Sequence, residues 1–214
     1  MSPLEAAFAH ADPSVRLNAA LRAGMTPSPA DVEVLLRRCA AEPDFQVREM
    51  LTWALIRQPA DQVVPRVVAE LTRPEPQARQ QALHTLSKFK DGSAWAAVAR
   101  CLDDAEPDVV RTTWYTAVAL APLHKRQWLA EKLAAHLGRG DEDMQRSLSR
   151  ALVALGADVI GPVLAVAAER SNAAIRQHVA ATERLLEDAE SGFAGSLNHA
   201  RREVALGRTR STKG

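Results

Sequence analysis

Residues 42–59 read EPDFQVREMLTWALIRQP, and this stretch decides the fold. From Val47 onward its apolar residues recur at intervals of three and four, which predicts an amphipathic helix. Asp44 is a residue type that caps a helix start, and Pro59 is one that ends a helix. Residues 29–41 (PADVEVLLRRCAA) show the same period. The two segments together predict a helical hairpin.

The start of this second helix recurs along the chain. An arginine, preceded in most copies by an apolar residue, returns after 32, 31, 32, 35 and 30 residues: Arg16, Arg48, Arg79, Arg111, Arg146 and Arg176. Three or four residues before these arginines stand Asp12, Asp44, Glu75, Asp108, Glu142 and Asn172. A repeat of about thirty residues predicts stacked hairpins, each burying its apolar face against its neighbours.

Every segment follows a helical period and none alternates cleanly at period two, which predicts an all-α fold without a sheet. The first helices of the hairpins are predicted at 4–10, 29–41, 61–71, 93–102, 125–137 and 159–169. The second helices are predicted at 13–23, 45–57, 77–89, 109–121, 143–155 and 173–188. Residues 1–188 would form a right-handed α–α superhelix of about six hairpins. A separate helix over 189–207 would cover its last edge, and 208–214 would be a disordered basic tail.

Four of these copies carry a resemblance to a known family. They read DPSVRLNAALRAG (12–24), EPDFQVREMLTWAL (42–55), RPEPQARQQALHTL (73–86) and AEPDVVRTTWYTAVAL (105–120). The chain resembles HEAT repeats, particularly the short bacterial form found in phycobilin lyases. The resemblance implies that the acids and arginines form a structural ladder between repeats, and that the second helices line a concave binding face. The ladder interpretation is favoured over a row of cations for phosphate, because each acid lies within pairing reach of its arginine.

Counting from each arginine indicates which residues face the groove. The predicted binding residues are Glu49, Trp53, Gln80, His84, Thr112, Tyr115, Thr116 and Arg150. Trp53 and His84 hold equivalent positions in adjacent helices, so they could form a contact pair for a partner, or Trp53 could pack over the neighbouring helix. Trp114 is predicted in the core, and Trp95 and Trp128 on the outer layer. His124, His136, His178 and His199 are predicted at the surface or at helix ends.

Composition narrows the function classes. The formal net charge of +1 gives no global attraction to nucleic acid, although residues 189–214 carry a local excess of three positive charges. The two cysteines, Cys39 and Cys101, lie in apolar helical contexts and are predicted to be buried thiols. No apolar run of 18 residues and no targeting signal stands in the sequence, so we expect a cytoplasmic protein that does not span a membrane.

Enzymatic interpretations find little support in the residues. Alkylpurine DNA glycosylases are built from similar repeats, but duplex binding needs a basic groove, which this composition does not favour. Deoxyhypusine hydroxylases need His-Glu pairs, and no histidine here precedes a glutamate. Phosphate-cradling loops, CxxC and HExxH are absent from the sequence. We therefore expect a non-enzymatic scaffold that binds a protein or peptide, without cofactor or metal; a DNA-binding, glycosylase-type or lyase-like protein is the alternative.

Overall fold

The computed structural model describes residues 2–170 and 172–205, and within these ranges every regular element is helical. The predicted all-α fold is confirmed. The chain divides into two compact units between Lys132 and Leu133, and each unit is described by itself.

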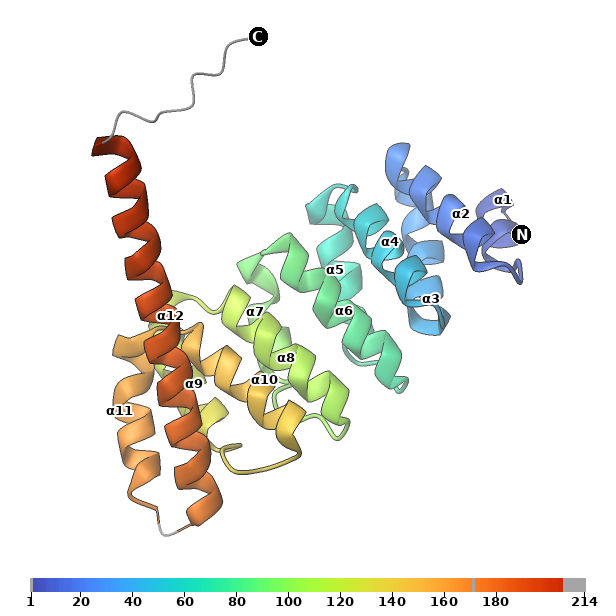
Figure 1. The fold of residues 1–214 in the computed structure, drawn as a ribbon. Coiled ribbons are helices and arrows are strands. Elements are labelled where there is room, and N and C mark those ends of the chain that lie inside the picture. Colours follow the sequence, from blue (N-terminus) through green and yellow to red (C-terminus); the bar gives the residue numbers. More distant parts are fainter. Residues whose placement is uncertain (1, 171, 206–214) are drawn as a thin grey trace. The chain divides into compact units, whose positions relative to one another are not determined.

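In the first unit, first and second helices of hairpins alternate. The first helices are α1 (Pro3–Phe8), α3 (Val32–Ala41), α5 (Ala60–Glu70) and α7 (Trp95–Ala99); the second are α2 (Pro13–Met25), α4 (Phe45–Ile56), α6 (Pro76–Phe89) and α8 (Pro107–Leu120). Short 3-10 turns, η1 (Pro29–Asp31), η2 (Gly92–Ala94) and η3 (Leu123–Lys125), precede α3, α7 and α9 (Arg126–Ala134). Figure 1 shows the second helices side by side: α2 packs on α4 and α6 packs on α8, while α3 and α5 pack on α4 and α6.

The second helices begin where the sequence pattern places their caps. The carboxylate of Asp12 accepts a hydrogen bond from the backbone N–H of Ser14, and that of Asp44 accepts one from Val47. Pro76 and Pro107 occupy the first turns of α6 and α8, where the missing N–H has no partner to lose. The recurring acid and proline therefore set the register of each second helix.

The core consists of the apolar stripes that the period predicts. Leu51, Leu55 and Leu83 are completely buried, and Trp114 is 1% exposed, as expected for a core residue. Both cysteines are buried free thiols, and burial raises the pKa of Cys39 to about 12, so that thiol stays protonated. Trp95 and Trp128 meet edge to face with ring centroids 6.1 Å apart, away from the second helices.

The second unit contains α10 (Glu142–Val153), α11 (Ala157–Ala168) and α12 (Ala173–Ala205), and α12 packs against both other helices. The prediction of a break near residue 189 is wrong, because the helical backbone continues from 173 to 205. A separate capping helix at 189–207 is therefore not formed, and its last two residues, like the predicted tail 208–214, lie outside the described residues. The glycines at 192 and 195 do not interrupt α12, since one glycine costs a helix only about 1 kcal/mol.

Candidate functional site

Four of the recurring arginines bind backbone carbonyls in the turn between the first and second helices of their own hairpin. One terminal nitrogen of Arg48 donates to the carbonyls of Glu42 and Pro43 (2.9 and 2.8 Å). Arg79 makes the same pair of bonds to Arg73 and Pro74 (both 2.8 Å). Arg16 binds the carbonyls of residues 10 and 11 in the same way, and Arg176 binds the carbonyl of residue 170. These bonds satisfy turn carbonyls that no helix pairs.

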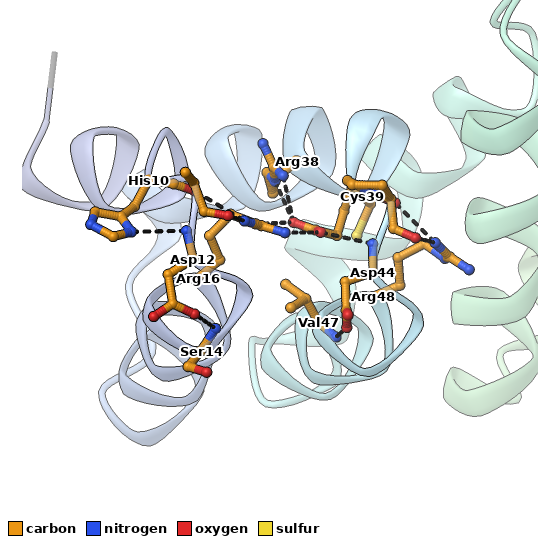
Figure 2. A network of polar contacts seen from close by, with 12 residues as sticks. His10, Asp12, Ser14, Arg16, Arg38, Cys39, Asp44, Val47 and Arg48 are labelled. Atoms are coloured by element: carbon orange, nitrogen blue, oxygen red, sulfur yellow. Dashed lines mark hydrogen bonds and ion pairs between the residues drawn. The ribbon is translucent and has the colours of Figure 1, made fainter.

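Arg16 also joins one repeat to the next. Its guanidinium donates two parallel bonds to the Glu42 carboxylate (2.9 and 2.8 Å), which also accepts bonds from Arg38 and the Asp44 N–H (2.6 and 2.9 Å). Figure 2 shows this network, which runs from His10 to Arg48. Burial opposes the charge of Glu42, but the bonds from Arg16, Asp44 and Arg38 outweigh burial and bring its pKa to about 2.

Arg79 on α6 forms the corresponding contact with the repeat that follows its own. It binds both carboxylate oxygens of Asp104 at 2.8 Å. The prediction that each arginine pairs with the acid before it on its own helix is therefore wrong for Arg16 and Arg79. Asp12 and Asp44 act as helix caps instead, and Glu75 pairs with Arg73 at 3.1 Å. Among the recurring arginines in the described part of the chain, pairing with an acid of the same helix is found at Arg111, which contacts Asp108, and at Arg146, which contacts Glu142 and Asp143.

Several predicted groove residues lie on α4, α6 and α8. The Nε2 atom of His84 lies 3.0 Å from a carboxylate oxygen of Glu49, so these two side chains meet across α4 and α6. Burial lowers the pKa of His84, although Glu49 opposes this effect, so His84 tends toward its neutral form near neutral pH. Tyr115 is 60% exposed. We name Glu49, Gln80, His84, Thr112 and Tyr115 the α4–α8 face.

Three predicted groove residues, Thr116, Arg150 and Trp53, are not included in this face. Thr116 is 0% exposed and donates to the carbonyls of Leu83 and Thr112 (3.1 and 2.8 Å), so the prediction that it faces a ligand is wrong. It fastens α8 to α6 instead. Arg150 is exposed on α10, which belongs to the second unit.

Trp53 packs over the neighbouring helix, which decides between the two interpretations of this residue. Its ring lies so close to Gly24 on α2 that a Cβ atom there would sit 2.1 Å from ring atom Cζ3 and 3.0 Å from the Ala54 Cα. The guanidinium of Arg57 lies over the Trp53 ring, 6.0 Å from its centroid. The ring is therefore a packing element between α2 and α4.

This contact predicts that Gly24→Ala destabilises the first unit by about 2 kcal/mol, because overpacking outweighs the gain in helix propensity. Urea unfolding followed by tryptophan fluorescence measures the change, since all four tryptophans lie within residues 1–132. Gly92→Ala is the matched control, because a Cβ there meets nothing within 4 Å. Equal midpoints for the two variants would contradict the packing role of Trp53.

Sequence reasoning missed a buried polar cluster in the second unit. His178 is 2% exposed, so its prediction as a surface residue is wrong. Its Nδ1 atom accepts from the Gly138 N–H (3.1 Å), and its Nε2 atom lies 2.9 Å from the Gln145 carbonyl and 3.0 Å from the Ser149 hydroxyl. The second residue after the arginine is also polar in three other second helices, where Gln81 and Thr113 are buried but Asn18 is exposed, so this position alone did not predict the burial of His178.

A depression of about 380 Å³ adjoins the α4–α8 face. Its walls come from α4 and from the first turns of α6 and α8: Arg48, Pro76, Gln77, Gln80, Glu106, Pro107, Asp108 and Val109. Among the residues with described positions, no group of three potential metal ligands is present. The described helices also include none that is long and apolar enough to span a membrane. The side chains that line the depression include both basic and acidic ones.

Comparisons with known proteins identify the repeat. Among solved structures, the chain is similar to an engineered protein of the Northeast Structural Genomics Consortium (16% identity, 89% of this chain and 100% of that one, TM-score 0.47). It is also similar to a designed armadillo repeat protein (13%, 86% and 98%, TM-score 0.46). The complex of CpcE and CpcF of phycocyanin lyase from Nostoc sp. PCC7120 is a third (19%, 84% and 74%, TM-score 0.49). No curated protein matches the chain. Residues 41–119 match the family model for HEAT repeats, and these residues of the chain are therefore HEAT repeats, as the sequence resemblance predicted.

Proposed function

We propose that this protein is a non-enzymatic interaction module that binds a peptide segment of a partner protein along the α4–α8 face. The observation that carries the proposal is the depression beside this face, to which three consecutive second helices contribute. Stacked helical repeats commonly bind extended ligands in this way, because each repeat adds side chains to one continuous surface.

The composition of the face suits a peptide. Tyr115 offers an exposed aromatic ring with a hydroxyl, and Gln80 offers both a donor and an acceptor. Glu49 and His84 add two partly exposed polar side chains that contact each other. An exposed aromatic ring bordered by polar side chains is typical of protein interfaces, in which aromatic residues are enriched and the rim is polar.

The acidic groups on and beside the α4–α8 face do not favour the DNA-binding alternative. Glu49, Glu106 and Asp108 place carboxylates on or beside it. A surface that binds duplex DNA instead neutralises several phosphates with lysine and arginine. Cytoplasmic location and the absence of catalysis belong to this proposal as expectations.

Selection from a displayed library of random peptides tests the proposal. Peptides of about twelve residues span roughly 40 Å when extended, which is enough to cross three helices. We expect selected peptides to bind the full chain, and the double variant Gln80→Ala/Tyr115→Ala to weaken their binding at least about tenfold.

The control is Leu123→Ala, which truncates another strongly exposed side chain outside α4, α6 and α8. It should leave peptide affinity unchanged. A library that yields no binder, or binders that tolerate the double variant, would contradict the proposal. A labelled DNA duplex measured in parallel should show no binding at physiological salt.

A further inference from the structure

Two of the arginine contacts follow one rule of register. Glu42 stands two residues before the cap Asp44, and Asp104 stands two residues before the cap position Glu106. Each of these acids receives both nitrogens of the arginine fork from the preceding second helix, namely Arg16 and Arg79. The separations along the chain are 26 and 25 residues. At these two places, stacking brings a carboxylate at the same position to the arginine of the preceding second helix.

Arg48 breaks this rule. The next second helix, α6, has Glu75 at its cap position, and the residue two positions before this cap is Arg73. The Arg73 side chain pairs with Glu75. A cation thus stands at the sequence position where Arg16 and Arg79 find an acid, and Arg139 and Arg170 stand at the corresponding positions for Arg111 and Arg146. Throughout the described part of the chain, no carboxylate lies within ion-pair distance of Arg48.

The other contacts of Arg48 leave part of its guanidinium group able to bind a ligand. Its bonds to the carbonyls of Glu42 and Pro43 use one terminal nitrogen only. The Phe45 ring lies beside the guanidinium, with 5.8 Å to its centroid. In Figure 2, Arg48 lies at the opposite end of the network from His10, and its guanidinium points away from Arg16. There it lines the depression with the first turns of α6 and α8.

The charges around the depression define the ligand further. Arg48 supplies a cation from α4, whereas Glu106 and Asp108 supply carboxylates at the start of α8. Asp108 is already in contact with Arg111. These carboxylates would repel a small multivalent anion such as phosphate. They favour a segment in which a basic side chain accompanies the acid.

We propose that the depression at Arg48 binds the carboxylate of a peptide segment that also carries a basic side chain, in the two-bond geometry that Glu42 and Asp104 show within the fold. The inference rests on the proposed peptide-binding function and names the chemistry of the peptide. Bidentate pairing suits an arginine fork, because two parallel bonds fix both the position and the orientation of the carboxylate.

Position 73 gives the sharpest test, because an acid there would occupy the fork from within the chain. We expect Arg73→Glu to pair with Arg48, raise the thermal midpoint by about 3 °C, and weaken binding of an acid-containing selected peptide at least about tenfold. Arg73→Gln is the matched control, since it removes the same charge without supplying a carboxylate. It should bind the peptide as the unaltered chain does.

A double-mutant cycle completes the test. The probes are a peptide selected on the unaltered chain and the same peptide with its glutamate replaced by glutamine. Each peptide is measured once with an amidated C-terminus and once with a free C-terminus. Arg48→Gln should weaken the glutamate peptide about tenfold and the glutamine peptide hardly at all. Equal losses for both peptides, or equal binding by Arg73→Glu and Arg73→Gln, overturn the proposal at Arg48. Failure to select any peptide overturns the proposed function instead, so the two failures are distinguishable.

Discussion

Glu42→Gln is expected to lower the free energy of unfolding of the first unit by about 3 kcal/mol. The Glu42 side chain is 0% exposed and accepts bonds from Arg16, Arg38 and the Asp44 N–H. In the glutamine variant, the NH2 group of the amide would face N–H groups that now donate to the carboxylate. The buried Arg16 guanidinium would also lose its counter-charge. Urea unfolding followed by tryptophan fluorescence isolates this unit, because the second unit contains no tryptophan.

The same carboxylate gives a signature in pH. The pKa of Glu42 is about 2 in the folded chain, below its ordinary value of 4.5. Its contribution is therefore fully present above pH 4.5 and is lost as the pH falls toward 2, by about 3 kcal/mol in all. The glutamine variant should lack this component of acid unfolding. Glu75→Gln is the control, because Glu75 pairs only at the surface, and its curve should follow that of the unaltered chain.

This prediction depends on a contact that the sequence alone could not assign. The arginine spacing predicted the repeat correctly, because every hairpin places its arginine at the same point of the second helix. The partner of Arg16 lies 26 residues downstream, however, and Asp12 stands much nearer in sequence. Local spacing therefore favoured the wrong acid. Only the stacking of α2 beside α4 brings Glu42 to the guanidinium.

The side of each second helix that packs into the core was largely predictable from the sequence. Apolar positions such as Leu51 and Leu55 were assigned correctly, since burial follows the helical period. Thr116 was assigned to the groove because it lies at the same distance from its arginine as Trp53 and His84 do from theirs. A threonine on a helix can hydrogen-bond a carbonyl and be buried, as Thr116 does between α8 and α6. The register along the helix was therefore not enough to predict which residues at this position are covered by the neighbouring helix.

A comparable error concerned His178, and its correction leads to a second large effect. His178→Ala should destabilise the second unit by about 3 kcal/mol, because it opens a cavity and leaves the Gly138 N–H and the Ser149 hydroxyl short of a partner. Far-UV circular dichroism during urea unfolding measures this change, with tryptophan fluorescence recorded in parallel to separate the first unit. His124→Ala, at an exposed position of the first unit, should change neither signal.

The contacts of His178 also fix its protonation. The Gly138 N–H points at Nδ1, so the ring is neutral with its proton on Nε2. That proton is donated toward Ser149 or the Gln145 carbonyl, Ser149 donates to Thr182, and Thr182 donates to the His178 carbonyl. One arrangement of protons thus satisfies the whole cluster. A second proton on the ring would set Nδ1–H against the Gly138 N–H.

It follows that the second unit loses stability in mild acid. Burial lowers the pKa of His178 below 6.5, although the Gln145 carbonyl opposes this effect. As the pH falls through 6.5, the unfolded chain takes up a proton that the folded chain resists, so the free energy of unfolding decreases. In His178→Gln, which cannot titrate, this decrease should disappear from the circular dichroism transition. A decrease of unchanged size in that variant would assign the acid sensitivity to other groups and contradict the role of the cluster.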